Sequence, residues 1–163
     1  MIYVTLGTQA SDFSRCMKMV EELVEEANIK EKIVAQTGYT TYHPTCVECF
    51  DFVSEYKYQE LMGNADIIIS HAGTGALFSS IKKGKKVIAV ARLAKYGEMV
   101  NNHQTEIVRK LSGEGYILDG TYDMKAAWEK VSNFEPRKDD FHCEISNRIE
   151  QLVTDWGISK KKQ

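Results

Sequence analysis

The sequence lacks long hydrophobic runs and has only two prolines in 163 residues. Its uninterrupted apolar stretches, such as Val87–Ala91, are far shorter than the roughly 20 residues that a membrane-spanning helix needs. The chain begins directly with a strand-like pattern, and no charged segment followed by an apolar one precedes it. We therefore expect no signal peptide and a cytoplasmic protein.

The sequence also has no excess of positive charge and few cysteines. The formal net charge is −2, so we expect no nucleic-acid partner. Four cysteines agree with a reducing compartment. Cys46 and Cys49 have the spacing of half a zinc site, but no second Cys-x-x-Cys follows, and the pair lies in a segment predicted to be irregular. We expect no metal and no cofactor.

Short apolar runs alternate with helix-like periodicity along most of the chain. Strands are predicted at 1–6, 33–35, 50–53, 67–69, 87–91 and 116–118, and helices at about 12–27, 58–65, 76–83, 103–113, 122–132 and 140–156. Ser11 or Asp12 is the expected cap of the first helix. This alternation predicts an α/β fold of Rossmann-like type, with about six mostly parallel strands and helices on both faces. We expect one domain over 1–157 and a flexible basic tail over 158–163.

The segment 65–104 carries the strongest functional signal. A strand leads into the turn His71-Ala72-Gly73-Thr74-Gly75, and a helix, a second buried strand and a long polar loop follow. Glycines allow a ligand to approach the backbone closely, and a helix start offers unpaired N–H groups to a phosphate. In parallel α/β folds ligands bind beyond the carboxyl ends of the strands. Three loops are expected there: Gly7–Ser11, His71–Gly75 and Arg92–Gln104.

Four short segments carry a resemblance to a known family: Val4–Thr8, Ser70–Gly75, Tyr96–Glu98 and Asn101–Gln104. With them the sequence resembles the donor-binding half of the family 28 type glycosyltransferases, which have two Rossmann-like domains (the GT-B architecture). It is most similar to stand-alone small subunits. One is the catalytic subunit of the eukaryotic UDP-GlcNAc transferase that acts on dolichol-linked GlcNAc-diphosphate, and the other is its bacterial relative in capsule and exopolysaccharide operons. The segment 92–98 resembles the bacterial branch more.

The resemblance implies an inverting hexosyltransferase that uses a UDP-sugar without an obligatory metal. It assigns Gly73, Thr74 and Gly75 to the diphosphate, and Asn102, His103 and Gln104 to the sugar. Together with the loop positions it gives a full set of predicted donor-binding residues: Gly7, Thr8, His71, Gly73, Thr74, Gly75, Arg92, Glu98, Asn102, His103 and Gln104. Where larger relatives hold the ribose with a glutamate, this sequence has Ser79.

The catalytic base is not assigned by the sequence, and His71 is the only candidate that it offers. His71 directly follows a strand, so it could equally hold the turn by hydrogen bonds or contact the donor. Likewise His103 could cap its helix or meet the sugar. The transferred sugar is open among galactose, glucose, glucuronic acid and GlcNAc.

The chain is too short to contain an acceptor-binding half as well. The resemblance therefore implies a separate membrane-attached subunit, which binds a lipid-diphosphate-linked sugar and recruits this chain to the inner membrane face. The helix at 140–156 is expected to brace that interface. The alternative function is a non-catalytic nucleotide-binding regulatory module. A dinucleotide-dependent oxidoreductase is disfavoured, because no G-x-G-x-x-G opens the first helix.

Overall fold

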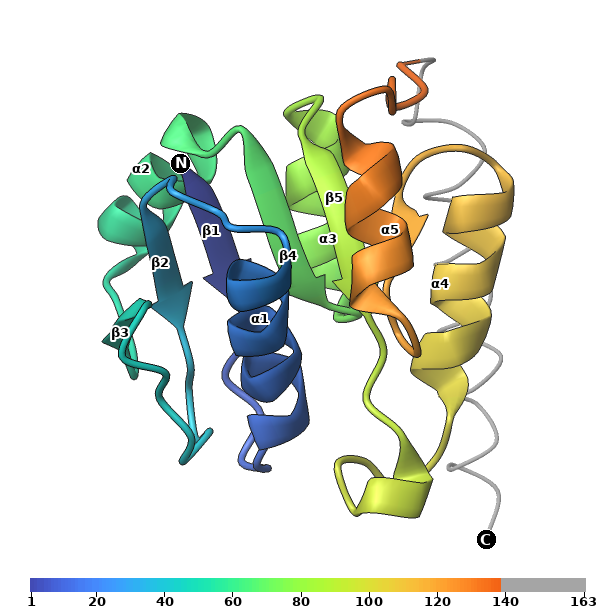
Figure 1. Cartoon of the computed structure of the whole chain (residues 1–163). Helices are drawn as coiled ribbons and strands as arrows, with labels where there is room; N and C mark the ends of the chain where they lie inside the picture. Colours follow the sequence, from blue (N-terminus) through green and yellow to red (C-terminus); the bar gives the residue numbers. More distant parts are fainter. Residues whose placement is uncertain (139–163) are drawn as a thin grey trace, which may run out of the picture.

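A computed structural model describes residues 1–138 and contains one six-stranded parallel sheet (Figure 1). The strands are β1 (Ile2–Thr5), β2 (Ile33–Gln36), β3 (Glu48–Phe50), β4 (Ile67–His71), β5 (Lys86–Val90) and β6 (Leu118–Asp119). The helices are α1 (Ser14–Glu26), α2 (Glu55–Asn64), α3 (Thr74–Lys82), the short 3-10 helix η1 (Ala94–Tyr96), α4 (His103–Gly113) and α5 (Met124–Val131).

The sheet has the strand order β3-β2-β1-β4-β5-β6, and every neighbouring pair is parallel. The order reverses between β1 and β4, which pair from Ile2 with Ile67 to Thr5 with Ser70. In doubly wound sheets this reversal opens a crevice at the carboxyl ends of the two central strands. The predicted Rossmann-like α/β fold is therefore confirmed.

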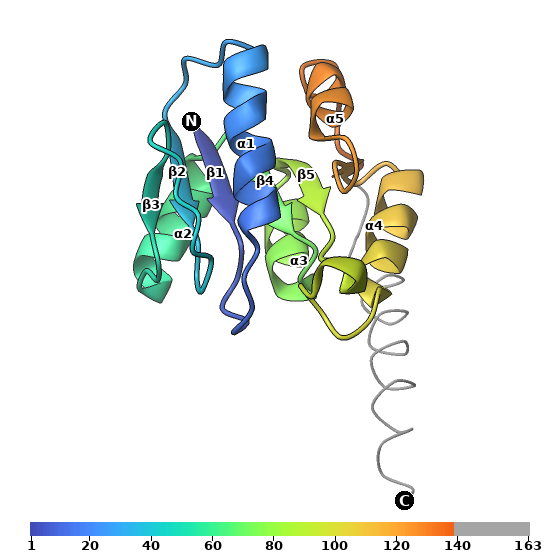
Figure 2. The same ribbon diagram turned by 60° about the horizontal axis from the view of Figure 1, so that its bottom comes forward.

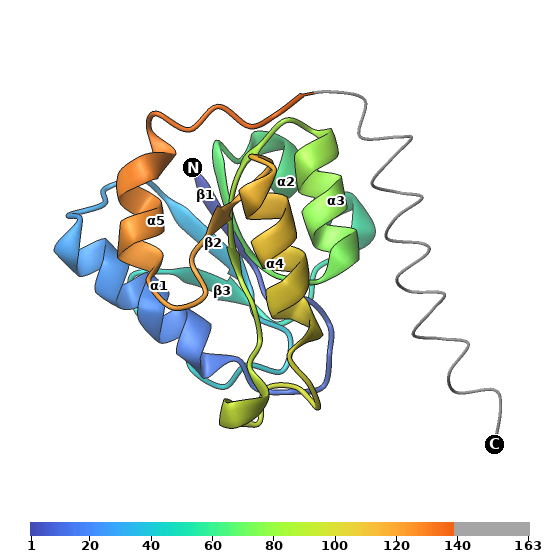
Figure 3. The same cartoon turned by 90° about the vertical axis from the view of Figure 1, so that its right-hand side faces the viewer.

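The four inner strands, β1, β2, β4 and β5, send alternate side chains into two hydrophobic cores, one on each face of the sheet. Tyr3 and Ile68 point to the core under α2, α3 and α4, while Val4 and Ile69 point to the core under α1 and α5. Figure 3 shows these two helix layers on opposite sides of the sheet. Both faces are covered, which explains why the central strands read as continuous apolar runs in the sequence.

Within residues 1–138 the predicted strands and helices are present in the predicted order, but some of their ends differ. β3 spans Glu48–Phe50 and not 50–53, because its pairing partner β2 ends at Gln36, which lies opposite Phe50. α3 begins at Thr74, two residues before the predicted start. The N-cap of α1 is Phe13, and neither Ser11 nor Asp12 takes that position. Asp12 instead accepts the N–H groups of Ser14 and Thr41.

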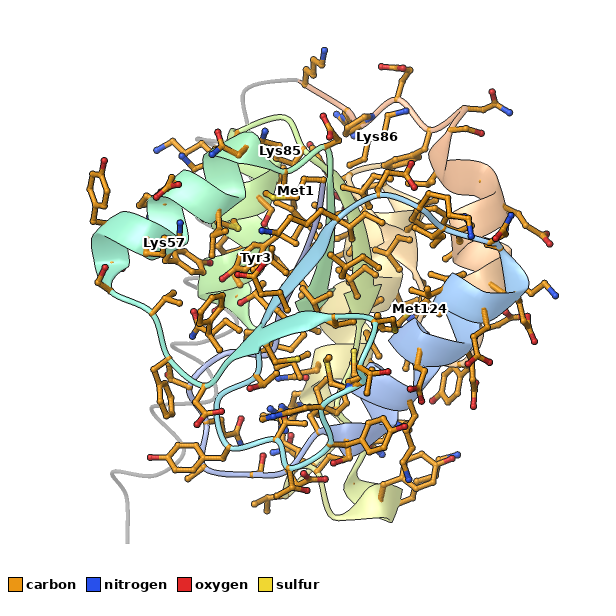
Figure 4. All side chains as sticks on the ribbon, turned by 60° about the vertical axis from the view of Figure 1, so that its left-hand side comes forward. Met1, Tyr3, Lys57, Lys85, Lys86 and Met124 are labelled. Atoms are coloured by element: carbon orange, nitrogen blue, oxygen red, sulfur yellow. The ribbon has the colours of Figure 1, made fainter. Side chains whose placement is uncertain are left out.

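Two lysines that follow Gly84, Lys85 and Lys86, lie at the amino edge of the sheet. Lys85 donates to the carbonyls of Gly63 and Ala65, and Lys86 donates to those of Val131 and Ser132. Figure 4 shows both lysines near Met1. These two lysines satisfy carbonyl groups at or just beyond the C-terminal ends of α2 and α5, so their role here is structural.

The predicted helix at 140–156 and the tail at 158–163 lie outside the described residues. Within residues 1–138, no helix is both long and apolar enough to cross a membrane.

A buried and an exposed aliphatic residue give a direct test of the packing. Ile68 in β4 is fully buried, whereas Val100 is 96% exposed. We expect Ile68→Ala to lower the free energy of unfolding by about 2–5 kcal/mol, because it leaves a cavity in the core. Val100→Ala should change it by less than about 0.5 kcal/mol. Urea unfolding of both variants measures this, and equal effects would contradict the packing described.

Candidate functional site

The loops that follow β1 and β4 meet at the carboxyl edge of the sheet, which Figure 2 turns toward the viewer. Between them lies a pocket of about 330 Å³. Five of the predicted residues line it: Gly7, Thr8, His71, Gly73 and Gly75. The structure thus brings the two glycine-containing loops into one site at the point where the strand order reverses.

The start of α3 forms the floor of this pocket with its backbone. Gly73 is the N-cap, no side chain caps the helix, and the Leu77 N–H makes the first intrahelical bond back to the Gly73 carbonyl. The N–H groups of Thr74, Gly75 and Ala76 therefore have no acceptor within the helix. With the positive end of the helix dipole they form an anion site of the kind that binds phosphates.

His71 is packed between the two glycine-containing loops. Its Nδ1 lies 3.0 Å from the Thr5 carbonyl, and because a carbonyl only accepts, Nδ1 carries the proton. A Cβ at Gly7 would lie 2.5 Å from His71 Nε2, and one at Gly73 only 2.2 Å from it. Both glycines are therefore required for the packing of this ring. Gly7 also has φ +75, a conformation that favours glycine.

Burial lowers the pKa of His71 to about 4. The ring is therefore neutral near pH 7 and a weak base. The hydrogen bond to Thr5 and the contact with both glycines give His71 a structural role. Of the alternatives that the sequence left open, this geometry supports the turn-holding one and not the catalytic base.

Gly75 differs from Gly73 in its surroundings. A Cβ at Gly75 would meet no atom within 4 Å, and the residue is exposed at the first turn of α3. No packing within the described chain requires glycine there. The open space above its N–H group is what a closely approaching ligand needs.

Arg92 and Glu98 do not face the pocket as predicted. The Arg92 side chain is 1% exposed, and its guanidinium donates to Ser11 and to the Leu6 carbonyl. Glu98 is 5% exposed and accepts two hydrogen bonds from Arg15, at 2.9 and 3.0 Å. It also accepts the Leu93 N–H. Direct contact with a ligand is at odds with these bonds, which instead connect the loops internally.

Asn102, His103 and Gln104 lie at the start of α4, beside the η1 segment. Asn102 is the N-cap of α4, and its Oδ1 accepts the Ala94 N–H at 2.9 Å. Gln104 is buried, and its Oε1 accepts the Arg92 N–H at 2.9 Å. The described pocket around Gly75 is lined by other residues. The predicted contact of these three residues with the sugar stays a prediction.

The pocket also contains residues that the sequence did not single out as binding residues. Gln36, Val53, Glu55 and Tyr58 line its side toward β2 and α2. Gln36 is a polar residue that closes a buried strand, and that signal could have marked it. Val53 ends a predicted strand, and Tyr58 begins a predicted helix. In residues 1–138, no group of three or more His, Cys, Asp or Glu residues is arranged to hold a metal.

Comparison with known proteins gives one family match and several relatives. Residues 1–132 match the glycosyltransferase family 28 C-terminal domain. The UDP-N-acetylglucosamine transferase subunit ALG13 of Homo sapiens is 28% identical over 124 residues, which are 72% of this chain and 11% of the human protein. That of Candida albicans is 26% identical over 116 residues, 71% of this chain and 36% of the relative. The chain thus spans only a minor part of these relatives.

Solved structures with the same fold include an NMR solution structure of ALG13. It has a TM-score of 0.59 and 18% identity, and the match covers 93% of both chains. The glycosyltransferase of kitacinnamycin has a TM-score of 0.57 and 16% identity over 80% of this chain and 34% of its own. These likenesses show the fold, and the second is consistent with one half of a GT-B architecture.

The protonation of His71 gives a pH prediction. Its pKa is 6.5 when unfolded and about 4 in the fold, so between these values the unfolded chain binds more protons. Stability that is present above pH 6.5 should fall toward pH 4, by something on the order of 1–3 kcal/mol. His71→Asn keeps a donor for Thr5 but does not titrate. Urea unfolding at several pH values should therefore give a shallower slope for this variant, and identical slopes would refute the assignment.

Proposed function

Since the chain belongs to the glycosyltransferase family 28 C-terminal domain family, we propose that it is the donor-binding subunit of a UDP-sugar transferase. The uncapped start of α3 with open space over Gly75 carries this proposal. The diphosphate lies on the N–H groups of Thr74, Gly75 and Ala76. The nucleoside occupies the side of the pocket that Gln36, Val53 and Tyr58 line.

The proposed reaction is transfer of a hexose, with inversion, to a lipid-diphosphate-linked sugar. Negative charge develops on the leaving UDP, and preorganised N–H groups at a helix start stabilise it. The names of the relatives make UDP-GlcNAc the first donor to test, and galactose, glucose and glucuronic acid remain candidates. The capsule or exopolysaccharide setting rests on the segment 92–98, whereas the relatives reported above are eukaryotic ALG13 subunits.

A partner subunit is supported by the distribution of exposed hydrophobic side chains. Within residues 1–138 seven large ones are exposed, and these seven lie in or beside the loops that follow strands, at the carboxyl edge: Tyr39, Phe50, Phe52, Tyr56, Tyr96, Val100 and Tyr122. Exposed apolar side chains gathered on one side mark an interaction surface. We propose that this edge faces a membrane-attached, acceptor-binding subunit, which recruits the chain to the cytoplasmic membrane face.

A non-catalytic nucleotide-binding module is the second candidate, and one observation favours it. Within the described pocket the only carboxylate is that of Glu55, and the low pKa of His71 makes it a poor base. The site therefore holds groups for binding but few for proton transfer. In the donor-subunit proposal the partner supplies the base, whereas in the regulatory one no transfer occurs.

Two helical glycines allow a matched test of donor binding. A Cβ at Gly75 or at Gly63 meets nothing within 4 Å. Alanine should therefore be tolerated structurally at both positions. We expect Gly75→Ala to weaken UDP binding at least about tenfold, because the added methyl group occupies the space through which the diphosphate approaches the N–H, and losing one charge-assisted hydrogen bond costs roughly 1.5–3 kcal/mol. Gly63→Ala, in α2, should leave it unchanged. Calorimetric titration with UDP, UDP-sugars and NAD measures this.

Three results of that titration separate the candidates. Tighter binding of one UDP-sugar than of UDP supports a transferase donor site and names its sugar. Binding of UDP with no gain from any sugar supports the regulatory module. NAD binding without UDP binding would refute the transferase proposal.

The proposed partner surface can be tested by introducing a negative charge into it. Tyr122 is 70% exposed at the carboxyl edge, whereas Lys83 is exposed at the amino edge. We expect Tyr122→Glu to reduce co-purification with the acceptor-binding subunit at least about tenfold, since a buried unpaired charge is costly. Lys83→Glu should not reduce it. Full retention of the partner by Tyr122→Glu would place the interface elsewhere.

A further inference from the structure

Arg92 lies two residues after β5, yet its side chain reaches the loop that follows β1. Nη1 is 2.8 Å from the Ser11 hydroxyl oxygen, and Nη2 is 3.1 Å from the Leu6 carbonyl oxygen. Nη1 also lies within bonding distance of the carbonyls of Ser11 and Asp12. The guanidinium stacks over the Phe13 ring, 4.4 Å from its centroid. One side chain thus contacts both ends of the loop that carries Gly7 and Thr8.

The charge of Arg92 has no carboxylate bonded to it in the described chain. Its acceptors are carbonyls and one hydroxyl, and its Nε has no partner there. The nearby carboxylate of Glu98 is already bonded to Arg15. Burying a charged side chain is costly, and the carboxylates of Glu98 and Asp12 offset part of that cost through space and not by a direct bond. The position is therefore explained by the geometry of the guanidinium, whose two terminal nitrogens reach separate carbonyls.

Ser11 connects this contact to a second segment. Its hydroxyl accepts from Arg92 and donates to the Glu98 carbonyl, 3.0 Å away. The Arg92 backbone N–H in turn donates to Gln104 Oε1. Three segments meet here: the loop after β1, the η1 segment and the start of α4. The loop after β1 contributes to the wall of the donor pocket, and the start of α4 contains the residues predicted to contact the sugar.

We infer that Arg92 is a positioning residue, which acts through Ser11 to hold the loop after β1 in a fixed position relative to the η1 segment and α4. The effect that this inference predicts for ligand binding rests on the proposed donor site. If the Arg92 side chain fixes the position of the loop after β1 relative to the η1 segment and α4, its loss should weaken recognition of the sugar. Recognition of UDP should change less, because the start of α3 contacts neither Arg92 nor Ser11 through any bond described above.

The test uses two variants and one control. Arg92→Lys keeps the charge, but a single ammonium cannot replace two diverging nitrogens. Ser11→Ala removes only the connecting hydroxyl, so it remains informative if the lysine variant fails to fold. Ser112→Ala is the control, because it is a partly buried serine whose hydroxyl donates to the Arg109 carbonyl within α4.

The first measurement needs no ligand. The Phe13 N–H donates to Thr40 Oγ1, and the Leu93 N–H donates to the Glu98 carboxylate, so these two amides report on the two connected segments. We expect hydrogen exchange at both to rise at least about fivefold in Ser11→Ala, while the β4 amides keep their rates. Unchanged exchange at both, or equal acceleration in β4, would overturn the positioning role.

The second measurement is the ratio of UDP-sugar to UDP affinity. We expect this ratio to fall at least about fivefold in Ser11→Ala and Arg92→Lys, with UDP affinity within about twofold. A loss of UDP affinity as large as the loss of UDP-sugar affinity would contradict the inference. If the unaltered protein binds no UDP-sugar, the proposed function fails, and the exchange measurement alone decides whether Arg92 positions the loops.

Discussion

The hydrogen bond from His71 to the Thr5 carbonyl is the constraint on which the site depends. It joins the carboxyl ends of β4 and β1, the two strands between which the sheet reverses its order. The bond places the imidazole against the backbone of both loops, so neither Gly7 nor Gly73 can carry a side chain. Because the ring leaves room only for glycine at position 73, the N-cap of α3 has no side chain, and no side-chain cap is present at the start of the helix.

This arrangement makes the proposed phosphate site almost entirely a backbone feature. No lysine or arginine is among the residues that line the described pocket, and Glu55 adds a negative charge. A diphosphate bound there would be held by N–H groups and by the helix dipole. Such groups are rigidly placed and cannot relax away from the charge that develops on a leaving diphosphate. Because backbone N–H groups carry no net charge, the net charge of the chain does not indicate whether this site binds a diphosphate.

The fold could be predicted from the sequence because its signals are local. Buried parallel strands give short apolar runs in the sequence, and helices give a periodic spacing of apolar residues. The sequence therefore predicts the six strands in the correct order. The ends of the strands are harder to predict, as at β3, which ends at Phe50 because its partner β2 ends opposite it at Gln36. The glycine turn was also visible. The difference between Gly73 and Gly75 was not, because it depends on where the His71 ring lies in space.

Arg92 and Glu98 show why loop charges were harder to assign. The type of a loop residue gives the charge of its side chain but does not show where that side chain points. The bonding partners of Arg92 and Glu98 are also distant in sequence. Arg92 bonds to Leu6 and Ser11, and Glu98 bonds to Arg15. Only the folded sheet brings the segments after β1 and β5 together at one edge. A charged residue directly after a buried strand is therefore as compatible with a buried loop contact as with a ligand.

The carboxyl edge combines two properties that are unusual together in a finished binding site. It holds a pocket with well-placed donors, and it exposes aromatic side chains on both sides of the sheet's centre, with Tyr39 and Phe52 toward β3, and Tyr96 and Tyr122 toward β6. Donors alone would suit an independent nucleotide-binding protein, which gains nothing from exposed apolar area. Both together suit half of a site, in which a second protein covers the aromatic surface and encloses the ligand. Enclosure would also remove water from the uncapped start of α3, where its N–H groups then act on the diphosphate at a lower dielectric.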